Sequence, residues 1–426
     1  MKILIINKSD SKGGAAVVSR RLMDALSEQG ASVSMLVTDR TPDATADVAL
    51  AAAPWRMKIP FLSERLGIFA ANGFDRGTLF RIDNGAAGLP LHRHPMVREA
   101  DVIMLNWVNQ GMLSLRGVAE ICRLGKPVIW TMHDMWNFTG ICHHAGSCRG
   151  YMRECGNCTL LGRRSRPGDM SRVTLRRKEA VYAESSISFV AVSQWLAAKA
   201  RQSALLAERP VSVIPNAFPL HHGLPDRDRC HREFDQGGTP ARKRILFGAA
   251  RIDDPIKDFA TAAEATRILA SRYPEIAADV EFVTYGSVSD PAVFKDISLP
   301  HRHVGVTRGE ENLRRLYGAA DVVLSTSVYE TLPGTLVEGQ AYGCIPVAFD
   351  SGGQRDIVEH MRTGFLARRS GDLAGRAENI AEGLAWALLQ EENAGIRTAM
   401  RQHVADVFSY PAVAGKYLRL IESMRD

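Results

Sequence analysis

Two carboxylates flank a turn that is suited to binding an anion. Pro333 and Gly334 interrupt the chain just before a helical stretch that we expect from about Leu336 to Tyr342, and Glu330 and Glu338 stand on either side of this turn. Backbone N–H groups at a helix N-terminus point outward and carry partial positive charge, so they favour phosphate. A carboxylate beside such a site would repel a bound phosphate, because the two carry like charges. Its presence there is explained only if it has a ligand of its own. The hydroxyls of a sugar would supply that ligand for Glu330.

The same turn belongs to a strand–helix–strand unit. Apolar runs at 322–325 and 345–348 have strand character on both sides of the expected helix. Ligands of parallel sheets bind beyond the carboxyl ends of the strands, where both glutamates would lie. Glu338 also has a purely structural interpretation, since Thr335 to Glu338 fits a capping box in which the glutamate only accepts a backbone N–H.

A pair of basic residues follows another expected strand, at 245–248. Arg251 and Lys257 flank a turn that precedes a helix expected over 258–271, so both side chains can reach a diphosphate at the strand ends. The alternative for either residue alone is ordinary surface charge.

The beginning of the chain has a similar order of elements. A strand at 3–6 leads through a polar loop to Gly13 and Gly14, and a helix is expected over 15–27. Glycines between a strand and a helix can let a phosphate approach the backbone. The spacing is not that of a nicotinamide-binding motif, and a tight turn explains the glycines equally well.

A histidine ends one of the next strands. Apolar runs at 101–106 and 127–132 predict parallel strands that are covered on both faces, and the second ends in His133 and Asp134. His133 is therefore expected at the rim of the ligand crevice, although a lone histidine is more often a structural residue.

Four cysteines are concentrated in a short segment after this strand. Cys142, Cys148, Cys155 and Cys158 have the spacing C-x5-C-x6-C-x2-C, which can supply four thiolates to a structural zinc ion. His143 or His144 could replace one of the thiolates. The alternative, free or redox-labile thiols, stays open because the first pair is more widely spaced than a typical zinc knuckle.

Composition limits the remaining possibilities. A chain of 426 residues predicts two domains, and seven cysteines suit a reducing compartment. No apolar run is long enough to span a bilayer, so we expect a cytoplasmic protein. Residues 163–178 contain seven basic side chains and one acid, which is explained by a solvated helix face or by contact with anionic lipid. The stretch from about 40 to 95 cannot be assigned to elements, and we expect it to frame an acceptor.

The spacing of Glu330 and Glu338, E-x7-E, resembles the signature of the large retaining glycosyltransferase family 4, or glycosyl transferases group 1. The continuation from Ala341 to Gly353 and the segment from His133 onward are also similar to this family, especially to bacterial colanic acid and exopolysaccharide glycosyltransferases. The resemblance implies the GT-B fold, in which two Rossmann-like parallel-sheet domains face each other across a cleft. It implies an acceptor-side domain at 1–217 with the cysteine-rich insertion 142–158, a donor-binding domain at 218–404, and a last helix within 405–426 that crosses back onto the first domain.

The resemblance also implies roles for individual residues. Chemistry is assigned to His133, Glu330, Arg251 and Lys257. Binding of the nucleotide sugar is assigned to Gly13, Gly14, Arg251, Lys257, Glu330, Leu332, Gly334, Thr335, Leu336 and Glu338. The cysteines Cys142, Cys148, Cys155 and Cys158 are assigned to zinc, and no organic cofactor is implied.

We therefore expect a retaining glycosyltransferase that moves a sugar from a UDP- or GDP-sugar to a saccharide acceptor in synthesis of bacterial cell-surface polysaccharide, and we expect this acceptor to be lipid-linked. Its partners would be this donor, this acceptor and the anionic inner face of the cell membrane, but no nucleic acid. Two alternatives are a nucleotide-sugar epimerase of similar fold and a zinc-containing nucleic-acid-binding protein. The second alternative leaves Glu330, Arg251 and Lys257 without a role.

Overall fold

The computed structural model describes residues 1–220, 226–235, 243–307, 309–390 and 394–425. These residues form two compact units, each with its own sheet and core. Unit 1 contains residues 1–217 together with the chain from Tyr410 onward, and unit 2 contains Phe218–Ser409.

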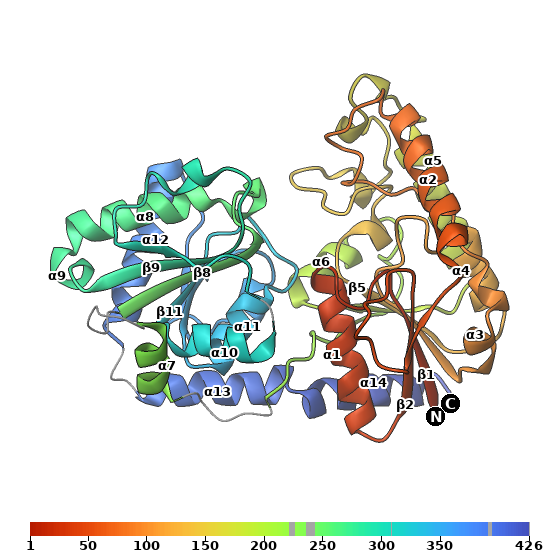
Figure 1. Ribbon diagram of the computed structural model, residues 1–426. Coiled ribbons are helices and arrows are strands. Elements are labelled where there is room, and N and C mark those ends of the chain that lie inside the picture. Colours follow the sequence, from red (N-terminus) through yellow and green to blue (C-terminus); the bar gives the residue numbers. More distant parts are fainter. Residues whose placement is uncertain (221–225, 236–242, 308, 391–393, 426) are drawn as a thin grey trace. The chain divides into compact units, whose positions relative to one another are not determined.

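Unit 1 is built on a seven-stranded parallel sheet with the order β3-β2-β1-β4-β5-β6-β7 (Figure 1). Its strands are β1 (Lys2–Ile6), β2 (Ser32–Val37), β3 (Val48–Leu50), β4 (Val102–Leu105), β5 (Val128–Met132), β6 (Ser188–Ala191) and β7 (Val211–Val213). The central strands β4 and β5 are buried along their whole length, as expected for strands that are covered by helices on both faces. The sheet therefore brings the carboxyl ends of β1, β4 and β5 to one edge.

Seven α-helices belong to the described part of unit 1. They are α1 (Gly14–Glu28), α2 (Pro54–Ala71), α3 (Pro95–Glu99), α4 (Leu115–Cys122), α5 (Met170–Ala183), α6 (Gln194–Arg201) and α14 (Tyr410–Ser423). Helix α14 buries Val413, Tyr417 and Ile421 in the same core as residues of α1 and β1, at the spacing of one helix face. The Tyr417 hydroxyl lies 3.0 Å from the Thr131 hydroxyl of β5, so the last helix is tied to the centre of the sheet.

Unit 2 is built on a six-stranded parallel sheet with the order β10-β9-β8-β11-β12-β13. Its strands are β8 (Lys243–Arg251), β9 (Val280–Ser287), β10 (His301–His303), β11 (Val322–Ser325), β12 (Ile345–Phe349) and β13 (Phe365–Ala367). Its α-helices in the described residues are α7 (Arg227–Phe234), α8 (Phe259–Arg272), α9 (Pro274–Ala277), α10 (Glu310–Gly318), α11 (Gly334–Ala341), α12 (Leu373–Leu388) and α13 (Ala394–Phe408).

The helices of unit 2 cover both faces of its sheet. Figure 1 shows α8 and α12 on one face and α10 and α11 on the other. Buried side chains of α8 and α12 pack with inward residues of β8, β9, β11 and β12 in one apolar core. Two parallel sheets, each covered by helices, confirm the predicted α/β class with two Rossmann-like domains.

Candidate functional site

The chain after β11 leads to the predicted anion site. Helix α11 begins at Gly334, two residues earlier than expected, and its N-cap is Pro333, whose side chain makes no capping hydrogen bond. The N–H of Leu336 is used within the turn, since it donates to the Pro333 carbonyl at 3.2 Å. The outward-facing donors that remain are therefore those of Gly334 and Thr335.

Glu338 is not part of a capping box. Because Pro333 is the N-cap, Thr335 lies inside the helix and cannot play that role. The Glu338 carboxylate instead accepts a hydrogen bond from the Tyr317 hydroxyl, at 3.2 Å, and Tyr317 lies 2.8 Å from the Tyr285 hydroxyl. Burial and then the Glu338 charge raise the pKa of Tyr285, so it is neutral at physiological pH and can act as a donor.

Glu330 and Lys257 form an ion pair between the loop after β11 and the loop after β8. Ser327 adds a hydrogen bond to the same carboxylate oxygen of Glu330, at 3.0 Å. The Lys257 and Glu330 side chains are 25% and 23% exposed, so the pair remains accessible from solvent. The sequence assigned Lys257 to diphosphate and Glu330 to sugar, and the structure brings these two side chains into direct contact.

The loops that carry this pair are fixed by backbone contacts. Thr326 donates its hydroxyl hydrogen bond to the carbonyls of Lys257 and Asp258, at 2.8 and 3.0 Å. The Val328 N–H donates to the Ile256 carbonyl at 2.8 Å. The positions of Lys257 and Glu330 are therefore set by the ends of two adjacent strands, β8 and β11.

A second support for Glu330 comes from Gly352 and Gly353, which follow β12. The Gly353 N–H donates to the Glu330 carbonyl at 2.8 Å. A Cβ atom on Gly353 would lie 2.0 Å from the Thr331 carbonyl oxygen, and one on Gly352, whose φ is +61°, would lie 2.5 Å from that of Glu330. Only glycine permits such a close backbone approach, so this pair holds the Glu330 loop in place.

Arg251 lies at the end of β8 with half of its side chain exposed. Its guanidinium is 3.6 Å from Asp253 and 3.9 Å from Asp254. Desolvation raises the pKa of Asp253, but hydrogen bonds from the N–H groups of Ser289 and Asp290 outweigh it and lower the pKa. Asp254 accepts the Ile256 N–H at 3.0 Å, so both carboxylates have structural roles in their loops.

In unit 1, Gly13 and Gly14 form the start of α1. Gly13 is the N-cap with a φ of +89°, a conformation that favours glycine. A Cβ atom at either position would have no neighbour within 4 Å, so the space around this turn is open. The turn could therefore admit a phosphate, as the sequence predicted, but the open space itself does not distinguish this from a tight turn.

His133 follows β5 and is partly buried. Desolvation lowers the pKa of His133 to about 4, against the opposing effect of Asp134, so the imidazole is neutral at physiological pH. A neutral imidazole can exchange hydrogen bonds with a sugar hydroxyl without carrying a charge.

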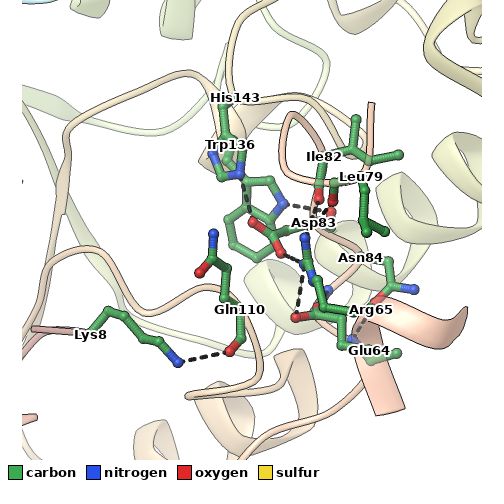
Figure 2. A network of polar contacts seen from close by, with 12 residues as sticks. Lys8, Glu64, Arg65, Leu79, Ile82, Asp83, Asn84, Gln110, Trp136 and His143 are labelled. Atoms are coloured by element: carbon green, nitrogen blue, oxygen red, sulfur yellow. Dashed lines mark hydrogen bonds and ion pairs between the residues drawn. The ribbon is translucent and has the colours of Figure 1, made fainter. Parts of the chain in front are cut away.

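The adjacent Asp134 contacts His143, a member of the polar network in Figure 2 that the sequence did not reveal. Its carboxylate accepts hydrogen bonds from Trp107 Nε1 at 3.0 Å and from the Trp136 N–H at 2.8 Å, and it lies 2.8 Å from His143 Nδ1. Desolvation raises the pKa of Asp134, whereas His143 and the Trp136 N–H lower it, and the net shift is downward.

His143 bridges two carboxylates. Its Nε2 atom is 2.6 Å from Asp83, which in turn forms an ion pair with Arg65 of α2. Glu64, which precedes Arg65 in α2, accepts a hydrogen bond from the Gly85 N–H at 2.9 Å, and burial raises the pKa of Glu64. Both ring nitrogens of His143 are thus engaged with oxygen atoms, which excludes the predicted alternative role of this residue as a zinc ligand in the present arrangement.

The four cysteines do not show the predicted metal site. Among the residues that the structure describes, no group of three or more His, Cys, Asp and Glu side chains could hold a metal ion. Cys142, Cys148, Cys155 and Cys158 are free thiols, and burial raises the pKa of Cys142 to about 12 and that of Cys158 to about 11. Cys148 and Cys155 accept hydrogen bonds from the N–H groups of Gly150 and Gly140, at 3.4 and 3.2 Å. Burial likewise raises the pKa of Cys155, so three of the four thiols are held in the neutral form.

The basic stretch 163–178 separates into two parts. Arg163, Arg164 and Arg166 are exposed in the segment before α5. Lys178 is buried, donates to the carbonyls of Trp136 and Thr139, and has a pKa that burial lowers to about 7. The solvated helix face that the sequence suggested therefore does not describe the whole stretch.

Two Rossmann-like units, each with charged loops after its strands, are the architecture of the GT-B type of glycosyltransferase. The Glycosyltransferase Family 4 model matches residues 12–222, and the Glycosyl transferases group 1 model matches residues 242–385. The chain belongs to glycosyltransferase family 4, as its E-x7-E motif predicted.

Similar proteins agree with this assignment. The chain is 27% identical over 193 residues to a glycogen synthase of Pseudomonas putida, covering 42% of this chain and 36% of that protein. It is 27% identical over 174 residues to the putative colanic acid biosynthesis glycosyl transferase WcaC of Escherichia coli, covering 38% of this chain and 40% of that protein. The matched parts span less than half the length of these relatives.

Solved structures share the fold over whole chains. Anabaena HepE in complex with UDP and glucose superposes with a TM-score of 0.63 at 15% identity, covering 99% of this chain and 100% of that one. Sucrose-phosphate synthase from Thermosynechococcus elongatus gives a TM-score of 0.64 at 17% identity, covering 100% and 99%. At these identities the likeness establishes the fold alone.

Proposed function

We propose that this protein is a retaining glycosyltransferase that moves a sugar from a nucleotide diphosphate sugar to a saccharide acceptor in bacterial cell-surface polysaccharide synthesis. The observation that carries the proposal is the Lys257–Glu330 ion pair, held by backbone contacts at the ends of β8 and β11 and followed in the chain by the uncapped N-terminus of α11. This arrangement offers a cation and outward N–H groups for a diphosphate, together with a carboxylate for sugar hydroxyls.

The donor is proposed to bind unit 2. Arg251, Lys257 and the N–H groups of Gly334 and Thr335 would stabilise the negative charge that develops on the departing diphosphate. Glu330 would hold the donor sugar, and Glu338 would accept hydrogen bonds from the ribose, with Tyr317 fixing its carboxylate. The side chains of Leu332 and Leu336 are buried, so they support this loop from within rather than offering surface to the donor.

The acceptor is proposed to bind unit 1, where His133 follows the end of β5. Gly13 and Gly14, at the start of α1, keep the role in phosphate binding that the sequence suggested. Neutral His133 would contact the transferred sugar or the acceptor hydroxyl. In the retaining mechanism that we propose, no side chain acts as a nucleophile, because the departing phosphate accepts the proton of the acceptor hydroxyl on the same face of the sugar. The new bond from that hydroxyl oxygen to the sugar forms as the bond from the sugar to the diphosphate oxygen breaks.

One relative is named for glycogen synthesis and WcaC for colanic acid biosynthesis, and HepE was solved in complexes with UDP and glucose and with UDP-glucose. These similarities support a saccharide acceptor and a UDP-sugar donor here. None of the described helices is long and apolar enough to cross a membrane. We propose a peripheral contact with anionic lipid, which would serve a lipid-linked acceptor.

A thermal shift screen tests the donor assignment. UDP or GDP should raise the melting temperature, whereas an oligonucleotide should not, because a ligand that binds only the folded state stabilises it. Proton NMR of the product then tests retention, since the anomeric configuration of the transferred sugar should match that of the donor. Inversion would overturn the proposed mechanism, and stabilisation by oligonucleotide alone would favour the nucleic-acid alternative.

A further inference from the structure

Helix α2 (Pro54–Ala71), in the stretch that the sequence left unassigned, exposes a row of large apolar side chains. Trp55, Ile59, Leu62 and Leu66 have 64%, 60%, 54% and 66% of their surface exposed. At about 100° per residue, their spacing places all four within about 60° around the helix axis. Single exposed apolar residues are ordinary, but four in one row form a patch that marks an interaction surface. We call these four residues the apolar stripe.

The opposite side of α2 fixes the direction in which the stripe points. Glu64, Arg65 and Ile68 are buried, and the ion pair of Arg65 with Asp83 anchors the helix in the network of Figure 2. Gly111 also lies against this helix, because a Cβ atom there would be 2.4 Å from the Phe61 N atom. Rotating the stripe inward would break these buried polar contacts, so the stripe is held in its outward orientation.

Exposed cations border the stripe. Arg56 and Lys58 lie about 100° and about 60° from Trp55 around the helix, on opposite sides. Beyond the end of α2, the Arg164 side chain lies 3.7 Å from the Cβ position of Gly73, so the exposed basic segment that includes Arg163 adjoins this helix. Within the described residues, none of these four basic side chains forms an ion pair with a carboxylate of the protein.

A cavity of about 530 Å³ adjoins the first turns of the same helix. Its lining combines Trp55, Ile59 and Leu89 with the basic side chains Arg56 and Arg93. Apolar walls beside two guanidinium groups match a ligand that has a hydrocarbon part and an anionic head.

We propose that the apolar stripe and the bordering cations dock this protein on the surface of a bilayer that contains anionic phospholipid. The stripe would lie at the boundary between headgroups and acyl chains, with Trp55 at the interface, while the cations contact phosphate. The purpose of this docking, access to a lipid-linked acceptor, rests on the proposed function.

The charges argue against a second copy of the chain as the occupant. In a two-fold symmetric dimer the same patch meets itself, so Arg56 and Lys58 of both copies would be brought together without compensating carboxylates. Interface cores between proteins are depleted of charge, whereas anionic headgroups complement these cations.

Sedimentation with vesicles tests the proposal on the whole chain. The protein should bind vesicles of phosphatidylcholine with phosphatidylglycerol at least about tenfold more tightly than vesicles of phosphatidylcholine alone, and added salt should reduce this preference. Combining Ile59→Gln, Leu62→Gln and Leu66→Gln should weaken binding by at least about tenfold, since glutamine keeps the helix but removes the apolar surface.

A matched control is Leu389→Gln, which alters a leucine of unit 2 that is 67% exposed and should leave vesicle binding unchanged. UDP-induced stabilisation, measured for every variant, reports on folding and on the donor site separately. Absence of vesicle binding, or equal binding by the wild type and the triple variant, would overturn the docking proposal even where UDP still stabilises. A dimer that the triple variant disrupts, without vesicle binding by the wild type, would assign the stripe to a second copy instead.

Discussion

Removing the charge of Glu330 should change nucleotide binding and turnover in opposite directions. Lys257 is paired with Glu330 in the structure, so the carboxylate neutralises part of the charge that a diphosphate would meet. Replacing Glu330 with glutamine keeps the shape of the side chain, frees Lys257, and removes a negative charge near the ligand. UDP should therefore bind the Glu330→Gln variant more tightly than the wild type.

The magnitude follows from the exposure of the pair. Because both side chains are about a quarter exposed, water and salt screen the pair, and we take about 1 kcal/mol for its strength. That value corresponds to about fivefold tighter binding of UDP. Turnover should fall by at least about tenfold, or about 1.4 kcal/mol of transition-state stabilisation, because the sugar loses the carboxylate that positions it.

Isothermal titration calorimetry with UDP and with uridine, together with initial rates, measures these effects. Lys257→Gln provides the opposite perturbation and should weaken UDP binding while leaving uridine binding unchanged. Glu359→Gln is the matched control, since it removes the acidic partner of an exposed ion pair with Arg362 in the same unit. If Glu330→Gln weakened UDP binding as much as Lys257→Gln, the pair would not lie at the phosphate site and the assignment would fail.

Four further predictions follow. Gly353→Ala should lower turnover by at least about tenfold, because the added Cβ atom would displace the Glu330 loop. Gly375→Ala in α12 should not, since a Cβ atom there would be 3.5 Å from its nearest neighbour. Equal turnover of the two variants would show that Gly353 does not support the Glu330 loop. Arg251→Ala should weaken UDP binding more than uridine binding in calorimetry, and equal losses would make Arg251 structural. Because the pKa of His133 in the folded protein is about 4, the unfolded chain binds a proton first as the pH falls below about 6.5, which lowers the free energy of unfolding. The His133→Gln variant should therefore avoid up to about 3 kcal/mol of the stability that the wild type loses by pH 4. Free energies of unfolding in urea that fall equally with pH in both proteins would refute this. Brief EDTA treatment should leave the initial rate unchanged, because cationic groups are proposed to neutralise the diphosphate, and a loss restored by magnesium would instead assign a metal to carboxylates such as Asp253.

Much of the sheet architecture is predictable from local sequence. Strands β4, β5, β11 and β12 are short apolar runs, as expected for strands buried on both faces, and the structure places each within a residue or two of its predicted bounds.

Helix α2 could not be found from its pattern. Two of its three buried residues, Glu64 and Arg65, are charged, whereas the apolar residues of the stripe are exposed. Its sequence therefore lacks the inward apolar face that marks an amphipathic helix. Pro60 lies inside it, and proline in a helix interior normally predicts a break.

Contacts between distant residues were equally invisible. The Lys257–Glu330 pair joins residues 73 positions apart, and the contact between His143 and Asp83 joins residues 60 positions apart. Motif spacing identified Glu330 and Lys257 as residues of interest, but only the adjacency of β8 and β11 brings them together. Neither Asp83 nor Glu64 stands in a motif, and no local signal could have selected them.

The position of α14 in the core of unit 1 has a consequence for synthesis on the ribosome. Residues 218–409, which form unit 2, are translated between the two segments of unit 1, so unit 2 can bury its core while unit 1 still lacks a helix. Until α14 emerges, the surface that Val413, Tyr417 and Ile421 later cover stays open to solvent, and the Thr131 hydroxyl lacks its Tyr417 neighbour. The unit that is begun first is therefore completed last.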